Sequence, residues 1–259
     1  MLLVLDVGNT NTTLGVYEGA ELRHSWRLTS ERHRTVDEYG VMCRTLLLLA
    51  GLESAQVTEI AISSVVPPLD FTLHKMAQVY FHVEPLFVTA KNSGMPVLYD
   101  DPSEVGADRI VNAVAAFEKY GGPCIVVDFG TATTFDAISQ AGEYLGGIIF
   151  PGIQISADAL FQRAARLHKT EIRRPEKVIG TNTTASIQSG LYYGNIGVVD
   201  GVLEKMIEEM GAGTHVVATG GLAPLISRGS RLIEKADADL TLEGLRIIYE
   251  RNRTGHTQS

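Results

Sequence analysis

Two short loops of similar composition stand half a chain apart, and they restrict the possible folds more than any other feature. Their sequences are DVGNTNTT at residues 6–13 and DFGTATT at residues 128–134, in a chain of 259 residues. Each loop follows an apolar run that predicts a buried strand, and each leads directly into another apolar stretch. Because the gap is too short for a crossover helix, we expect the two strands around each loop to be antiparallel. The repeat indicates an internal duplication.

Apolar periodicity along the rest of the chain predicts alternating strands and helices. We expect strands at residues 2–5, 14–17, 22–28, 59–66, 85–88, 124–127, 135–138, 144–149 and 215–218. We expect helices at residues 36–49, 69–81, 105–120, 153–167, 183–210 and 242–249. The expected fold class is therefore α/β, with two duplicated domains at residues 1–117 and 118–259.

Composition places the chain among ordinary globular proteins. Hydrophobic residues make up 45% of it and charged residues 20%, which excludes global disorder. The net charge of -8 and the lack of a basic helix-turn-helix pattern argue against a nucleic-acid partner. No apolar run approaches the ~18 residues of a membrane span. Cys43 and Cys124 have neither zinc-site nor disulfide-framework spacing. We expect a cytoplasmic protein with no membrane partner.

The chemistry of the two loops suits a phosphate group. Glycine lets the backbone approach a phosphate closely, and successive backbone amides can then bind the anion. An aspartate at the end of a strand can hold a cation that offsets the phosphate charge. A single Asp-x-Gly turn is more often an ordinary hairpin turn, but the pair favours an ATP-dependent phosphotransferase. A third glycine-rich element, VVATGG at residues 216–221, either packs against the nucleotide or is a plain strand-to-helix turn.

A segment between the loops, GADR at residues 106–109, indicates the second substrate. Asp108 and Arg109 stand at the predicted start of a helix. An aspartate there can accept a proton from a substrate hydroxyl, and an arginine can bind a carboxylate through two N–H groups. These residues indicate a small substrate with a hydroxyl and an anionic end. A helix-start aspartate in a surface ion pair is the simpler alternative.

Seven motifs, taken in order, resemble one family. They are DVGNTNTTLG (6–15), SSVVPP (63–68), GADR (106–109), DFGTATTFD (128–136), GGIIFPG (146–152), NTTASIQSG (182–190) and VVATGGLA (216–223). Together they resemble the type III pantothenate kinases, which share the fold of actin, Hsp70-type chaperones and sugar kinases. The resemblance implies two duplicated actin-like (RNase H-like) α/β domains with ATP in the cleft between them.

The resemblance also implies a reaction and a set of residues. The family phosphorylates the terminal (4′) hydroxyl of pantothenate with ATP and Mg²⁺, the first step of coenzyme A biosynthesis. It implies that Asp108 is the general base and that the other pantothenate contacts are Tyr99, Gly106, Ala107, Arg109 and, from a partner chain or the facing wall, Thr183. It implies ATP contacts at Asp6, Val7, Gly8, Asn9, Thr10, Asn11, Thr12, Thr13 and Thr131. It further implies Mg²⁺ at Asp6, a monovalent cation (K⁺ or NH₄⁺) at Asp128, and a homodimer.

One position departs from the family pattern. Many relatives carry Gly-Lys-Asn-Thr where this chain has Gly-Thr-Asn-Thr at residues 180–183, so Thr181 removes a cation near the substrate site. Two alternative functions stay open: a kinase for another small hydroxylated acid, and a non-catalytic transcription accessory protein of the Bvg accessory factor type. Intact Asp6, Asp108 and Asp128 argue against the second alternative.

Overall fold

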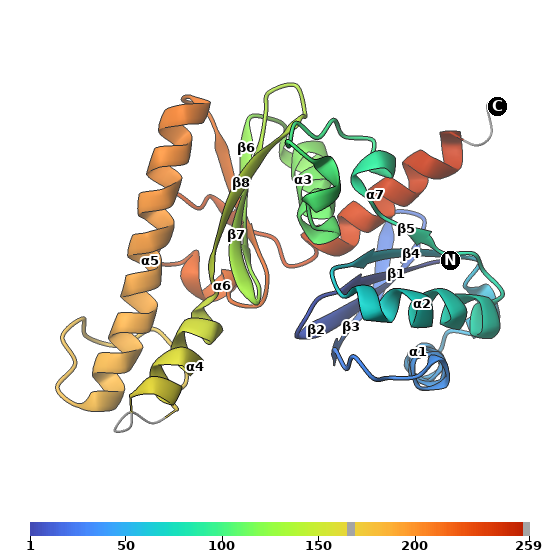
Figure 1. The fold of residues 1–259 in the computed structure, drawn as a ribbon, viewed down its shortest axis with the longest axis horizontal. Helices are drawn as coiled ribbons and strands as arrows, with labels where there is room; N and C mark the ends of the chain where they lie inside the picture. Colours follow the sequence, from blue (N-terminus) through green and yellow to red (C-terminus); the bar gives the residue numbers. More distant parts are fainter. Residues whose placement is uncertain (165–168, 256–259) are drawn as a thin grey trace. The chain divides into compact units, whose positions relative to one another are not determined.

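The computed structural model describes residues 1–164 and 169–255, and its framework is two five-stranded sheets of the same topology (Figure 1). The strands of the first sheet, in the order β3-β2-β1-β4-β5, are β1 (Leu2–Val7), β2 (Asn11–Glu18), β3 (Glu21–Thr29), β4 (Glu59–Ser64) and β5 (Leu86–Phe87). The strands of the second, in the order β8-β7-β6-β9-β10, are β6 (Cys124–Phe129), β7 (Ala132–Ile138), β8 (Tyr144–Pro151), β9 (His215–Thr219) and β10 (Lys235–Ala236).

Strand direction is also repeated between the sheets. β1 and β6 each pair antiparallel with the strand that follows them, and each pairs parallel with the fourth strand of its sheet. The predicted antiparallel openings and the predicted α/β duplication are therefore confirmed.

Within the described residues, seven α-helices connect or cover the strands. They are α1 (Val36–Leu49), α2 (Pro67–Met76), α3 (Ala107–Tyr120), α4 (Ile153–Arg163), α5 (Thr183–Met210), α6 (Ala223–Ile226) and α7 (Leu240–Gly255), with short 3₁₀ turns at Ser54–Gln56, Ala90–Asn92 and Pro102–Glu104. The predicted bounds of α1 and α5 match. The helix predicted at 69–81 changes to a π-helical turn at Ala77–Phe81, which ends at His82 in a left-handed conformation. Residues 165–167 of the predicted fourth helix lie outside the described residues.

The chain forms two compact units that do not follow sequence order. The first unit contains residues from Met1 to Ala115 together with α7, and the second runs from Ala116 to Asp239. The prediction that residues 118–259 form the second domain is therefore wrong for α7. This helix packs on β1, β2 and β4 of the first sheet, where Leu240, Leu245 and Ile248 are fully buried.

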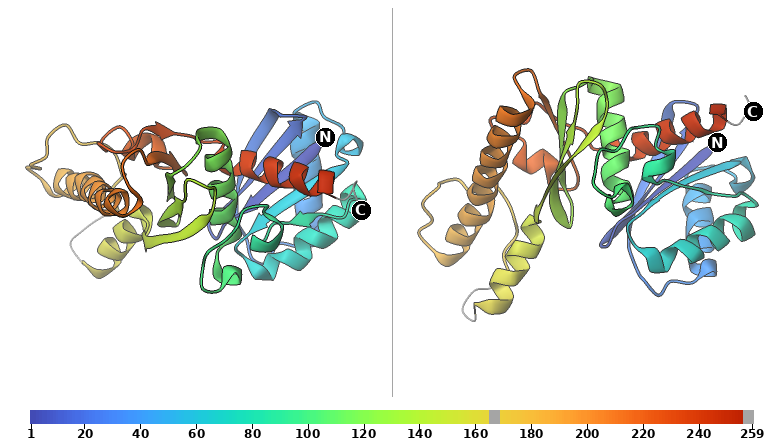
Figure 2. Two further views of the ribbon diagram at one scale, coloured as in Figure 1. Left: turned by 90° about the horizontal axis from the view of Figure 1, so that it is seen from above. Right: turned by 45° about the horizontal axis from the view of Figure 1, so that its top comes forward.

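Each sheet has an apolar core on a helix-covered face. In the first unit, Leu3 and Leu5 of β1 pack in one cluster with residues of α1 and α2. α7 covers the other face, so β1 is almost continuously buried, as expected for a strand covered on both sides. In the second unit, the core contains Val127 of β6 and Leu203 of α5. α4 packs against α5, and Figure 2 shows the two helices side by side. Among the described residues, no helix is both long and apolar enough to span a bilayer.

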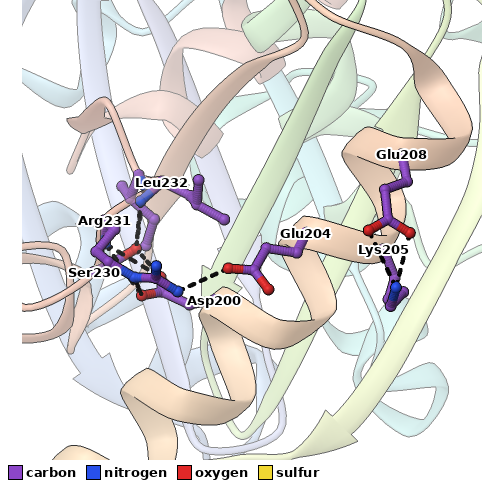
Figure 3. Close-up of polar contacts among 8 residues, drawn as sticks. Asp200, Glu204, Lys205, Glu208, Ser230, Arg231 and Leu232 are labelled. Atoms are coloured by element: carbon purple, nitrogen blue, oxygen red, sulfur yellow. Dashed lines mark hydrogen bonds and ion pairs between the residues drawn. The ribbon is translucent and has the colours of Figure 1, made fainter.

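A buried carboxylate on α5 holds the segment that follows α6 (Figure 3). Asp200 is 5% exposed and accepts hydrogen bonds from the Ser230 hydroxyl at 2.5 Å and from the Arg231 backbone N–H at 3.2 Å. The exposed Arg231 guanidinium also contacts Glu204 at 2.7 Å. A buried carboxylate that accepts several hydrogen bonds holds the donor groups firmly in place. This network therefore ties the chain that leads into β10 to the middle of α5.

Candidate functional site

The first loop, which we define as residues 8–11, is a four-residue turn between the paired parts of β1 and β2. The last paired residues are Val7 and Thr12, and the Gly8 N–H donates to the Asn11 carbonyl at 3.0 Å. A Cβ atom on Gly8 would lie 3.1 Å from that carbonyl oxygen, so a side chain there would crowd the turn. Asn9, Thr10 and Asn11 are exposed, while Thr12 is fully buried. The turn thus presents its polar residues outward from a fixed base.

The segment that follows β3 supports this first loop. The Ser30 N–H donates to the Thr10 carbonyl at 3.0 Å, and the Ser30 and Thr12 hydroxyls are 2.8 Å apart. Arg32 donates from its guanidinium to the side-chain oxygen of Asn9 at 3.1 Å. Sequence reasoning missed Arg32, because nothing in the order of residues shows that the end of β3 returns to the first loop.

The second loop, residues 130–132, lies between β6 and β7 and is one residue shorter. The last paired residues are Phe129 and Thr133, and the Gly130 N–H donates to the Ala132 carbonyl at 3.1 Å. Two glycines from elsewhere in the second unit approach it closely. A Cβ atom on Gly152 would lie 2.2 Å from the Thr131 carbonyl oxygen, and one on Gly220 would lie 2.4 Å from a carboxylate oxygen of Asp128. Gly220 belongs to the VVATGG element, which therefore lies against the end of β6, where the second loop begins.

Behind the second loop, β7 carries a fully buried aspartate that the sequence analysis did not single out as a site residue. Asp136 accepts a hydrogen bond from the Thr134 hydroxyl at 3.0 Å and another from the Tyr144 hydroxyl at 2.7 Å. Thr134 is the strand partner of Asp128, so the side chains of these two residues lie on the same face of the sheet. Asp136 therefore holds the hydroxyl that stands next to Asp128.

The GADR residues form the start of α3 in the first unit. A Cβ atom on Gly106 would lie 2.6 Å from Oδ1 of Asp108 and 3.4 Å from a methyl group of Val65, so glycine makes room for the carboxylate. The same oxygen accepts the Arg109 backbone N–H at 2.8 Å. Burial raises the pKa of Asp108 above its ordinary value, and the Arg109 N–H opposes this shift only in part. A carboxylate with a raised pKa is a better proton acceptor than an exposed one.

The other predicted substrate residues differ in their exposure. Arg109 is 7% exposed, and Tyr99 and Ala107 are half-buried in the first unit. Thr183 belongs to the second unit, where it is exposed at the start of α5. Its neighbour Asn182 caps this helix by accepting the Ala185 N–H at 2.9 Å.

An open cavity of about 650 Å³ surrounds the start of α5. Its lining residues are Leu160, Gly180, Thr181, Asn182, Thr183, Ser186, Ile187, Gly190 and Leu191. Thr181 and Thr183 therefore share one hollow with Gly190 of α5.

The two loop aspartates and their threonine strand partners offer oxygen ligands to a cation. Within residues 1–164 and 169–255, no three His, Cys, Asp or Glu side chains gather into a group that could hold a metal ion. Asp6 and Asp128 are each half-buried near a strand end, and their cross-strand partners are the threonines Thr13 and Thr134. Such a donor set suits a hard cation that also has phosphate or water ligands, and it does not suit zinc.

Comparison with known proteins decides the family. The model of the type III pantothenate kinase family matches residues 2–205. The type III pantothenate kinase of Koribacter versatilis is 58% identical over 98% of this chain and 97% of its own length. That of Anaeromyxobacter sp. strain Fw109-5 is 59% identical over 98% of this chain and its own full length. The chain belongs to the type III pantothenate kinase family.

Solved structures bear on the fold of this family member. A Campylobacter jejuni protein described as a candidate Baf family transcriptional activator superposes with a TM-score of 0.62 at 19% identity, over 97% of this chain and 99% of its own. An activator of 2-hydroxyisocaproyl-CoA dehydratase from Clostridium difficile, with bound ADPNP, has a TM-score of 0.55 at 11% identity, over 100% of this chain and 98% of its own. At these identities the likeness shows the actin-like fold alone, and it confirms the predicted fold class.

Proposed function

We propose that this member of the type III pantothenate kinase family transfers the terminal phosphoryl group of ATP to the 4′-hydroxyl of pantothenate. This reaction is the first step of coenzyme A biosynthesis. The observation that carries the proposal is Asp108, a carboxylate with a raised pKa that Gly106 and Arg109 hold at the start of α3. Full-length relatives at 58–59% identity named type III pantothenate kinase support the choice of substrate over another small hydroxylated acid.

In this proposal Asp108 acts as the general base. It orients the pantothenate hydroxyl and accepts its proton as the new bond to phosphorus forms. Arg109 binds the carboxylate end of pantothenate, and Tyr99, Gly106 and Ala107 complete the contacts on the first unit. The near-complete burial of Arg109 supports this role, because a shielded guanidinium binds a carboxylate more strongly than an exposed one.

The two loops bind the phosphates of ATP. Residues 6–13 contribute backbone amides and polar side chains, and Thr131 contributes from the second loop. Asp6 would hold Mg²⁺, and Asp128 would hold a monovalent cation, K⁺ or NH₄⁺, with the Thr134 hydroxyl beside it. These cations offset negative charge on the phosphates, and phosphoryl transfer depends chiefly on such positioning and electrostatics.

The proposed oligomer is a homodimer, in which Thr183 contacts pantothenate bound by the partner chain. One face of α5 supports this assembly. Gly190, Gly194, Gly197 and Gly201 are exposed, and a Cβ atom on any of them would meet nothing within 4 Å. Small residues at this spacing let a second helix approach closely. We further propose a cytoplasmic enzyme without membrane or nucleic-acid partners.

A coupled assay of ADP release with pantothenate, with and without KCl or NH₄Cl, tests the reaction and the cation together. Asp108→Asn should keep the fold and lower turnover by about 10²-fold or more, because it removes the proton acceptor. Turnover at the parent rate in this variant would refute the assignment of the base. Release of ADP with other hydroxylated acids, but not with pantothenate, would favour a different kinase.

The raised pKa of Asp108 gives the same experiment a pH signature. The base works in its ionised form, so kcat/KM should fall as the pH drops through a pKa above that of an exposed aspartate. A raised folded-state pKa also means that ionised Asp108 costs stability, and this cost disappears once the pH is low enough to protonate it. Asp108→Asn should therefore melt at a higher temperature than the parent near neutral pH. In acid, where both side chains are uncharged, the two melting temperatures should converge.

A further inference from the structure

We propose that Arg32 is a triphosphate-binding residue, which supplies from outside the first loop the positive charge that both loops lack. This inference rests on the proposed function, since it assumes that ATP phosphates bind at the first loop. Residues 6–13 and 128–134 contain no lysine or arginine, yet each begins with an aspartate. A nucleoside triphosphate brings about four negative charges to these carboxylates, so a nearby cationic side chain has a clear electrostatic benefit.

The path of the chain after β3 puts Arg32 at the exposed side of the first loop. The Ser30 N–H donates to the Thr10 carbonyl at 3.0 Å, so the chain leaves the sheet beside the loop. The hydroxyls of Ser30 and Thr12 lie 2.8 Å apart, and this second contact holds the segment after β3 against the base of the first loop. Two residues later, the Arg32 guanidinium donates to Oδ1 of Asn9 at 3.1 Å. Backbone and side-chain contacts together therefore determine where Arg32 lies.

The charge of Arg32 is available for a ligand. Within the described part of the chain, Arg32 forms no ion pair with an acidic side chain, and both Arg32 and Asn9 are exposed. A guanidinium has five N–H donors and binds phosphate oxygens with two of them at once. The Asn9 contact needs only one donor. Because the Asn9 oxygen is the acceptor, its side-chain NH₂ group also stays a donor, so the pair presents N–H groups to an anion.

Arg23, on β3, offers a matched comparison for Arg32. It lies on β3 near the turn to β2, at the end of the hairpin away from the first loop, and it pairs with Glu18 and Glu21 at 3.5 Å. Both arginines are exposed. The same substitution at the two positions therefore changes net charge equally but removes a cation from the first loop only in one case.

The test compares Arg32→Gln, Arg32→Lys and Arg23→Gln by steady-state kinetics. Arg32→Gln should raise the KM for ATP about tenfold, the usual scale for one charge-assisted hydrogen bond, and leave the KM for pantothenate within twofold. Arg32→Lys should give an intermediate KM for ATP, because the charge remains and the two-pronged geometry is lost. Arg23→Gln should match the parent. An ATP KM within twofold of the parent for Arg32→Gln, or equal rises in both KM values, would overturn the proposal.

Thermal shifts with adenosine, ADP and ATP, each with Mg²⁺, give a second readout that does not depend on turnover. The stabilisation that ATP gives beyond adenosine should shrink in Arg32→Gln, while the adenosine shift stays unchanged. Equal ATP shifts in the parent and this variant would overturn the role of Arg32. If the parent neither responds to ATP nor phosphorylates pantothenate, the proposed function itself fails, which is a different result.

Discussion

The two aspartate-glycine hairpins share one strand register but are supported in opposite ways. In the first, residues 9–11 are exposed, and hydrogen bonds from Ser30 and Arg32 hold the loop. In the second, Gly152 lies against Gly130 and Thr131, and Gly220 lies against Asp128 and Phe129, both at distances that exclude a side chain. The duplication has therefore kept the strand pairing and changed what surrounds it. We infer from these contacts that the second hairpin is held more rigidly than the first.

A second difference between the hairpins lies at one equivalent position in the second strand of each. Gly15 in β2 pairs with Val4, and its counterpart Asp136 in β7 pairs with Val126. A Cβ atom on Gly15 would lie 3.0 Å from Leu242 of α7, so glycine admits that helix. Asp136 instead buries a carboxylate that two hydroxyls satisfy. The first hairpin uses this position for packing, and the second uses it for a polar network.

The largest effect is expected from closing the space beside Asp128. Gly220→Ala should lower the free energy of unfolding by about 3 kcal/mol and nearly abolish activity, because the new methyl group would meet the Asp128 carboxylate and the Phe129 backbone. Urea unfolding and the coupled assay measure both effects. Gly213→Ala is the matched control, since Gly213 has the same φ of 90° and open space around it. Equal losses in the two variants would show that backbone strain alone is responsible, and the picture of a rigid second hairpin would fail.

The next effect concerns the buried carboxylate. Asp136→Ala should lower the free energy of unfolding by about 2–3 kcal/mol, because the Thr134 and Tyr144 hydroxyls lose their acceptor in a buried site. Asp136→Asn, which keeps an oxygen acceptor, should lose less. Tyr144→Phe combined with Asp136→Ala measures the coupling of the pair by a double-mutant cycle. Additive losses would contradict the hydrogen bond between them.

The smallest effect is expected at the first hairpin. Ser30→Ala removes the 2.8 Å contact with the Thr12 hydroxyl and should cost about 1 kcal/mol or less in urea unfolding. Ser25→Ala, at an exposed position of the preceding strand β3, serves as the control and should have no measurable effect. If Ser30→Ala costs as much as Gly220→Ala, the two hairpins do not differ in rigidity.

Local signals made part of this structure predictable. The bounds of α1 agree with the prediction because its ends are set by nearby residues: Thr35 and Glu38 form a capping box, and Gly51 follows the last turn. α5 begins in the same way, with Asn182 as its cap. The two Asp-x-Gly hairpins and the GADR cluster were also predictable, since each is a continuous stretch of sequence.

Features that depend on distant residues were not predictable in the same way. The two-residue strand β10 exists because β9 lies beside it, and its own sequence carries no strand signal. Asp136 reads as an ordinary polar residue until Tyr144 and full burial are known. The roles of Arg32 and Gly220 become evident only from the residues that they contact in the folded chain. The roles of these residues depend on contacts between parts of the chain that are far apart in sequence. Local periodicity does not encode such contacts.

The membership of α7 in the first unit has a consequence for how the protein is made. Residues 1–115 leave the ribosome before α7, so the sheet face that receives Leu245 and Ile248 stays uncovered until α7 has been synthesised. Domains that are continuous in sequence can fold as they emerge. Here the second unit is the continuous one, so it can complete its fold while the unit translated before it still waits for its closing helix.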